Sequence, residues 1–182
     1  GTLTHRYEVS PQVQLKRFRA LMEQLGATNG AFGSRLHWAV RIEGAHDEDI
    51  GGSTVKTSRT HLHFALAEHK VSNGHKKALT PTQVTAFLKA QWTYGIAKLL
   101  EWDETKDGLG YVLKCNRGED SPEWNDIVEL SPALAKVLKR EQRNEEPKAR
   151  DPFALEIVNA LRERGVKVWF GDEAPNLQTP CA

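Results

Sequence analysis

The chain has 182 residues, 39% of them hydrophobic and 27% charged, with a formal net charge of +1, which is typical of an ordinary soluble globular protein of one domain. The near-neutral charge does not by itself indicate nucleic acid, so a nucleic-acid surface would have to be a local patch. No apolar run approaches the roughly 20 residues that span a membrane and no secretory pattern is present, so we expect a cytoplasmic location and no membrane contact.

The N-terminal part of the chain predicts one helix and one strand. Residues 11–26 have apolar side chains at near-helical spacing, with Ser10 as a cap and Pro11 as the first helical residue, which predicts an amphipathic helix. Residues 34–44 alternate well enough to predict a strand. One face of that strand would hold Leu36, Trp38, Val40 and Ile42, and the other would hold His37, Arg41 and Glu43.

A second strand is predicted within RTHLHFALAEHK, residues 59–70, and a polar loop would join it to the first strand as a hairpin. Thr80 and Pro81 then begin a helix that runs to about Trp92. The later elements are expected to be a strand at 94–103, a short helix containing Tyr111 and Lys114, helices at 131–146 and 151–165, and a strand at 166–172.

These elements predict an α+β fold with a central antiparallel sheet, helices on its faces and extra helices at the C-terminus. We expect residues 1–120 to form the core with its N-terminal helix. Residues 121–182 would form a helical extension packed on the same domain. Cys115 and Cys181 form no zinc-like cluster, and no GxxxxGK[ST] motif is present, so a thiolate metal site and a P-loop motor are not indicated.

Two histidines share one face of the strand predicted at 59–70. His61 and His63 are two residues apart, and such side chains on a strand point the same way, whereas the alternate apolar residues point into a core. Imidazole is the commonest metal ligand in proteins, so the pair indicates a metal site. An HxH pair also arises by chance in a chain with seven histidines, so a structural role stays open.

An acidic third ligand is expected if the metal is Mg or Mn, because two neutral imidazoles alone do not suit a hard ion. Glu43 is the candidate, since it lies on the polar face of the strand that would pair with the histidine strand. The loop between them is long, which leaves Asp47, Glu48 and Asp49 as rivals. The alternative for Glu43 is a solvated strand residue.

The motifs His61-Leu62-His63 and Tyr111-Val112-Leu113-Lys114, in this order, resemble those of the HUH endonuclease family. The resemblance is to the single-tyrosine replication initiator (Rep) proteins of rolling-circle plasmids and single-stranded DNA viruses, and to their transposase relatives. In that family a His-hydrophobic-His motif lies on a central strand and a later helix carries YxxK. The resemblance covers roughly residues 34 to 116, and the motif order counts against conjugative relaxases. The long loop after Glu43 is a departure from the family pattern.

The resemblance implies metal-dependent nicking and joining of single-stranded DNA through a 5′-phosphotyrosine on Tyr111, which would initiate rolling-circle replication. Lys114, three residues later on the same helix, would offset phosphate charge or orient the strand. Tyr94 and Tyr7 do not match the family position, so we expect a single-tyrosine enzyme. The implied partners are single-stranded DNA at an origin, open or folded as a hairpin, and a host or separate helicase. Oligomerisation stays open.

Basic residues on or beside the predicted catalytic strands are expected to form a local DNA-binding rim despite the near-neutral total charge. They are Arg35, Arg41, Lys56, Arg59, Lys76 and Lys77. Each of them, like Lys114, could instead be an ordinary surface charge, and Tyr111 could be a packing residue. The alternative functions are a transposase of the same superfamily, a non-catalytic origin-binding module and an unrelated metal-dependent hydrolase.

Overall fold

Two strands in the middle of the chain form the centre of the fold. They are β2 (Leu36–Glu43) and β5 (His61–Glu68), which pair antiparallel from Leu36 opposite Glu68 to Glu43 opposite His61. The computed structural model describes residues 1–28, 36–43, 47–50, 53–56, 60–68, 79–101, 103, 108–113, 127–142, 155–157, 159–160 and 167–169.

Four further strands extend this pair into a six-stranded sheet of order β6-β1-β5-β2-β7-β8. They are β1 (Thr2–Thr4), β6 (Ala97–Lys98), β7 (Ile127–Leu130) and β8 (Lys167–Trp169). All neighbouring strands are antiparallel except β7 and β8, which pair in parallel. The chain therefore has the predicted α+β class, and its histidine strand β5 lies inside the sheet.

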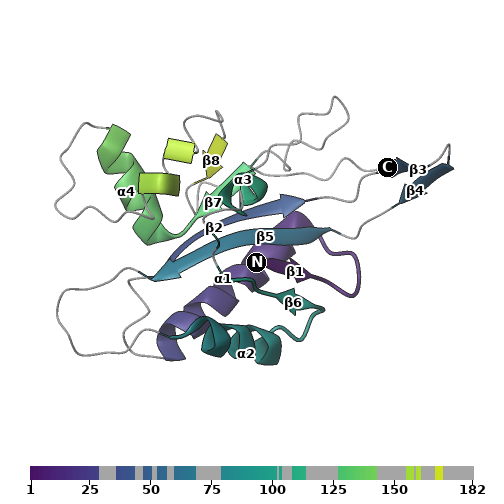
Figure 1. Ribbon diagram of the computed structural model, residues 1–182, viewed down its shortest axis with the longest axis horizontal. Coiled ribbons are helices and arrows are strands. Elements are labelled where there is room, and N and C mark those ends of the chain that lie inside the picture. Colours follow the sequence, from purple (N-terminus) through teal and green to yellow (C-terminus); the bar gives the residue numbers. More distant parts are fainter. Residues whose placement is uncertain are drawn as a thin grey trace.

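Helices cover both faces of the sheet (Figure 1). They are α1 (Pro11–Thr28) and α2 (Pro81–Gln91) on one face, and α3 (Gly108–Val112) and α4 (Pro132–Gln142) on the other. Alternation along β2 and β5 divides their side chains between two cores. Val40, Leu62 and Phe64 pack with α1 and α2, whereas Ala39 and Ala65 pack with α3 and α4.

The helices begin where the capping residues predict. The Ser10 hydroxyl accepts a hydrogen bond from the Val13 amide at 3.4 Å, and Thr80 forms a capping box with Gln83. Ser131 caps α4 in the same way, through the Leu134 amide at 3.2 Å. Among the helices that the structure describes, none combines the length and apolarity needed to cross a membrane.

Several elements differ from the sequence prediction. The polar loop after β2 contains β3 (Asp47–Ile50) and β4 (Ser53–Lys56), which form a separate two-stranded sheet. The strand predicted at 94–103 is reduced to the two residues of β6. Strands β1 and β7 were not predicted, and β7 pairs with β2 in the main sheet, so the segment after residue 120 is more than a helical extension.

The segment before β6 holds β1 against the sheet. The Thr4 amide donates to the Ile96 carbonyl at 2.9 Å, and the Trp92 indole donates to the Thr4 carbonyl at 2.9 Å. A Cβ atom placed on Gly95 would lie 2.1 Å from that same carbonyl oxygen. Only glycine lets these two segments of the backbone approach so closely.

Candidate metal centre

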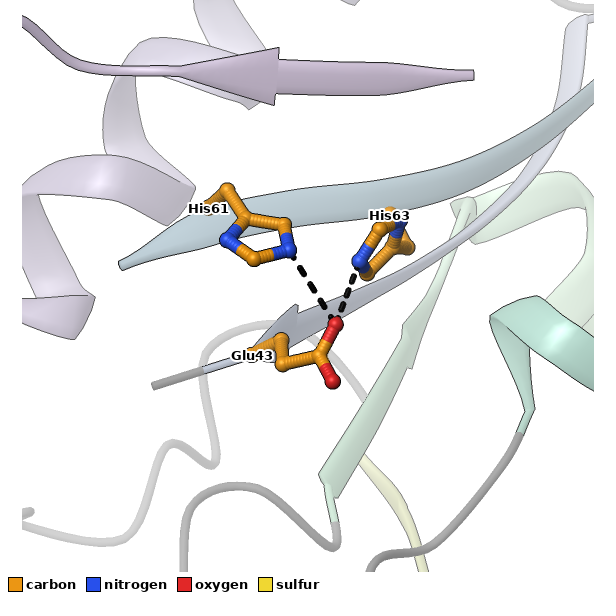
Figure 2. A group of neighbouring side chains, drawn as sticks. All are labelled: Glu43, His61 and His63. Carbon is orange, nitrogen blue, oxygen red and sulfur yellow. Dashed lines mark hydrogen bonds and ion pairs between the residues drawn. The ribbon is translucent and has the colours of Figure 1, made fainter. Parts of the chain in front are cut away.

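Three side chains from β2 and β5 meet on one face of the sheet. The Nε2 atoms of His61 and His63 lie 3.1 and 2.5 Å from the same carboxylate oxygen, Oε2 of Glu43. Figure 2 shows both imidazole rings projecting from β5 towards this carboxylate, which comes from the neighbouring strand. One ligand atom from each residue lies within 4.8 Å of the others, so the three side chains could hold a metal ion.

The strand ladder explains why these three side chains converge. Glu43 is opposite His61 in the β2–β5 ladder, and His63 is two residues further along the same face of β5. The side chains of Glu43 and His61 are 13% and 16% exposed, and that of His63 is 3% exposed. The group is thus recessed into the protein, with two of its members still reachable from solvent.

The protonation states suit a cation. Hydrogen bonds from His61, and next from His63, hold the pKa of the Glu43 carboxyl far below its usual range, so it is ionised at neutral pH. Burial lowers the pKa of His63, although the hydrogen bond to Glu43 opposes that effect. A neutral imidazole and an ionised carboxylate are the forms that coordinate metals.

Thr2 and Arg41 lie next to the three ligands. The Thr2 hydroxyl is 3.3 Å from Nδ1 of His63. Arg41 places a guanidinium nitrogen 3.6 Å from Oε2 of Glu43 and donates through Nε to the Val112 carbonyl at 3.1 Å. Sequence reasoning missed the contact of Thr2 because it depends on the pairing of β1 with β5.

Helix α3 packs against β2 and β5 on the same face as the three ligands. Its Leu109 and Val112 share a core with Ala39 and Ala65. Ala39 is four residues from Glu43 on β2 and Ala65 is two residues from His63 on β5, so each alanine lies on the same face of the sheet as that ligand. The backbone of Tyr111 belongs to this helix, but its side chain is not among those that the structure describes. A short helix containing Tyr111 and Lys114 was predicted, and the structure confirms it for Tyr111: α3 ends at Val112, and Lys114 lies outside the described residues.

The predicted basic rim is largely outside the described structure. Arg41 is 1% exposed and makes internal contacts, which does not fit its expected place on a DNA-binding surface. Lys56 belongs to β4 and the rival ligands Asp47, Glu48 and Asp49 to β3, and the side chains of these strands are not described. The remaining residues of the rim, which lie outside the described residues, are Arg35, Arg59, Lys76 and Lys77.

The donor set fits a divalent cation. Two imidazole nitrogens and one carboxylate oxygen are three ligands, and a catalytic metal site keeps at least one position for water or substrate beside its protein ligands. Comparisons of the chain with protein-family models, with curated proteins and with solved structures find no match. The chemistry of the site is therefore argued from its own residues.

Proposed function

We propose that this protein is a metal-dependent endonuclease that nicks and joins single-stranded DNA through a phosphotyrosine intermediate on Tyr111. The observation that carries the proposal is the position of one helix. Helix α3, whose backbone includes Tyr111, packs on β2 and β5, on the face where those strands present Glu43, His61 and His63. An HUH-type arrangement has the same parts, namely an HxH motif on a central antiparallel strand and a tyrosine helix over it.

Of Mg and Mn, the two ions expected from the sequence, Mn²⁺ is the one that we propose. Mg²⁺ is usually bound through one or two carboxylates and water, so two imidazole ligands fit it less well than they fit Mn²⁺. When bound, the ion would act as a Lewis acid on a phosphate oxygen and stabilise the charge that develops during cleavage. Holding that ion is the role we assign to Glu43, His61 and His63.

Tyr111 would supply the nucleophile. Its phenolic oxygen attacks phosphorus, the bond from phosphorus to the 3′-oxygen breaks, and the 5′-phosphate becomes an ester of the tyrosine. The leaving 3′-oxygen takes up one proton and the phenol gives one up, so the step is balanced. Attack by a 3′-hydroxyl on the ester reverses these changes and joins DNA, which is why one site could perform both reactions.

Of the other two tyrosines, Tyr94 is poorly placed for this role. The Tyr94 ring lies 3.9 Å from the guanidinium carbon of Arg17 on α1, and α1 covers the face of the sheet opposite α3. The position of Tyr94 supports the expectation of a single nucleophilic tyrosine. Tyr7 is 81% exposed, follows β1 and does not match the family position, and mapping of the adduct tests whether it reacts.

Covalent capture tests the proposal directly. The protein would be incubated with a mixed-sequence single-stranded DNA library and Mn²⁺, and protein-linked DNA would be detected on a denaturing gel and mapped by mass spectrometry. We expect an adduct on Tyr111 that is lost in Tyr111→Phe and in His63→Ala, with most DNA binding retained in both. Tyr94→Phe is the matched control and should form the adduct normally.

The same experiment separates the alternatives. DNA binding without an adduct under any metal condition would indicate a non-catalytic origin-binding module. Cleavage that persists unchanged in Tyr111→Phe would indicate a metal-dependent hydrolase, and an adduct on Tyr94 or Tyr7 would overturn the assignment of the nucleophile. Initiation of rolling-circle replication is the setting that the family resemblance implies, and a transposase would give the same adduct but require transposon-end substrates.

A further inference from the structure

Arg41 is the largest of the side chains that the structure buries almost completely. It lies on β2 opposite His63, two residues before Glu43, and is 1% exposed. Removing a guanidinium from water is costly unless its charge and its N–H groups find partners. Two of its contacts within the described residues join different parts of the molecule.

The first partner is the metal-ligand carboxylate. A terminal nitrogen of Arg41 lies 3.6 Å from Oε2 of Glu43, the same oxygen that both histidines approach. This positive charge also helps to keep the pKa of Glu43 low, after the two histidine hydrogen bonds. Arg41 therefore restrains the carboxylate from the side of the sheet where α3 packs.

The second partner is the backbone of α3. Nε of Arg41 donates to the Val112 carbonyl at 3.1 Å. Val112 is the last residue of the helix, and the last carbonyls of a helix have no partner within it. Arg41 therefore acts as a side-chain cap on α3.

We propose that Arg41 is a positioning residue that couples the metal centre to α3. Its rigid, planar guanidinium joins Oε2 of Glu43 to the carbonyl of Val112, the residue after Tyr111. It thereby sets the separation between the metal ligands and this helix. Lysine could not replace it, because an ammonium is a point charge on a flexible stem and lacks the two-armed geometry. In assigning importance to the position of Tyr111, the inference rests on the proposed function.

The structure offers a matched comparison on the opposite face of the sheet. Arg19 on α1 makes a two-armed contact with Glu129 on β7, at 2.6 and 2.8 Å, and Glu129 pairs with Val40, whose side chain lies on the face opposite the metal-ligand group. Arg19→Lys therefore makes the same chemical change as Arg41→Lys, at a site that joins a helix to the sheet but not to the metal centre.

Hydrogen exchange measured by mass spectrometry tests the coupling without using DNA. The Leu113 amide donates to the Leu109 carbonyl at 2.8 Å, so its exchange reports the opening of α3. Saturating Mn²⁺ should slow this exchange about tenfold in the parent protein and in Arg19→Lys, and less than about twofold in Arg41→Lys. Amides of α2, on the other face, provide the reference for any global change in stability.

The outcomes separate the coupling from the proposed function. If calorimetry shows that Mn²⁺ binds but hydrogen exchange of α3 is not slowed relative to that of α2 in the parent protein, the coupling is disproved. This measurement does not depend on the folding of any variant. Equal slowing in Arg41→Lys would also disprove it. Coupling without any covalent DNA product would overturn the proposed function alone, whereas no Mn²⁺ binding at all would overturn both proposals.

Discussion

The hydroxyl of Thr2 lies 3.3 Å from Nδ1 of His63, on the opposite side of the imidazole from the Nε2 atom that faces Glu43. A hydroxyl both donates and accepts hydrogen bonds, so Thr2 can partner either neutral tautomer of the ring. With a metal on Nε2, Nδ1 would carry the proton, and this N–H would donate a hydrogen bond to the hydroxyl oxygen of Thr2. Strand β1 thereby fixes the orientation of a ligand that β5 supplies.

Replacing Thr2 should weaken metal binding. Thr2→Val keeps the shape of the side chain but removes the hydrogen-bond partner of His63, and loss of such outer partners costs roughly tenfold or more in metal affinity. Calorimetric titration with Mn²⁺ would measure the change. Thr4→Val is the control, because its hydroxyl accepts from the Ile96 amide at 3.2 Å and its affinity should be close to that of the parent protein.

Removing the carboxylate should lower the pKa of His63 further. Burial is the main cause of its present low pKa, and the hydrogen bond and charge of Glu43 oppose it. Glu43→Gln removes the negative charge while burial and the nearby Arg41 remain, so the ring becomes harder to protonate. An NMR titration of the metal-free protein would show this, and a rise in the His63 pKa would contradict the geometry of the site.

Protonation of His5, which is not a metal ligand, should make the protein less stable in mild acid. Burial, and next the charge of Arg17, lowers the pKa of His5 from 6.5 to about 4. The unfolded chain therefore binds more protons between these values, so stability is full above about pH 6.5 and falls as the pH drops towards 4. His5 should account for roughly 1 to 2 kcal/mol of the loss between pH 7 and pH 5.

Urea unfolding at both pH values would measure this contribution. His5→Phe keeps a ring against Trp92, which His5 meets edge-on at 4.9 Å, but cannot be protonated. The variant should lose less stability than the parent protein on going from pH 7 to pH 5. An equal loss in both proteins would show that His5 is not the responsible group.

Gly95→Ala should destabilise the protein and weaken metal binding together. The new Cβ would lie 2.1 Å from the Thr4 carbonyl oxygen, so β1 would have to move, at a cost of about 1 to 3 kcal/mol. Movement of β1 would also disturb the contact between Thr2 and His63. Thr93→Ala, at an exposed position in the same turn, should change neither the unfolding midpoint nor the Mn²⁺ affinity.

The sequence predicted the strands β2 and β5, which are long enough to show an alternation of polar and apolar residues. Alternation separates His61 and His63 from Leu62 and Phe64 on β5, and the structure confirms that the apolar pair is buried in the core. The same reasoning selected Glu43, which the ladder places opposite His61. These predictions succeeded because adjacent residues of a strand must face opposite sides.

Features that depend on contacts between distant segments were not predictable in this way. Strand β1 has three residues, Thr2–Thr4, which is too short for a periodic pattern. Arg41 was expected at the surface because charged residues usually lie there, yet a carboxylate and a helix carbonyl allow it to be buried. Strand β7 was missed because its four residues, Ile127–Leu130, immediately precede the cap of α4.

The last pair of the β2–β5 ladder, Glu43 opposite His61, lies at the base of the long connection between these two strands. Between these two ligands lies the separate sheet of β3 and β4, which makes its own ladder from Asp47 opposite Lys56 to Ile50 opposite Ser53. The entropic cost of closing a loop grows only logarithmically with its length, and here the main ladder closes it already. The connection between β2 and β5 could therefore be shortened, lengthened or exchanged for a foreign peptide without shifting Glu43 and His61 at its base.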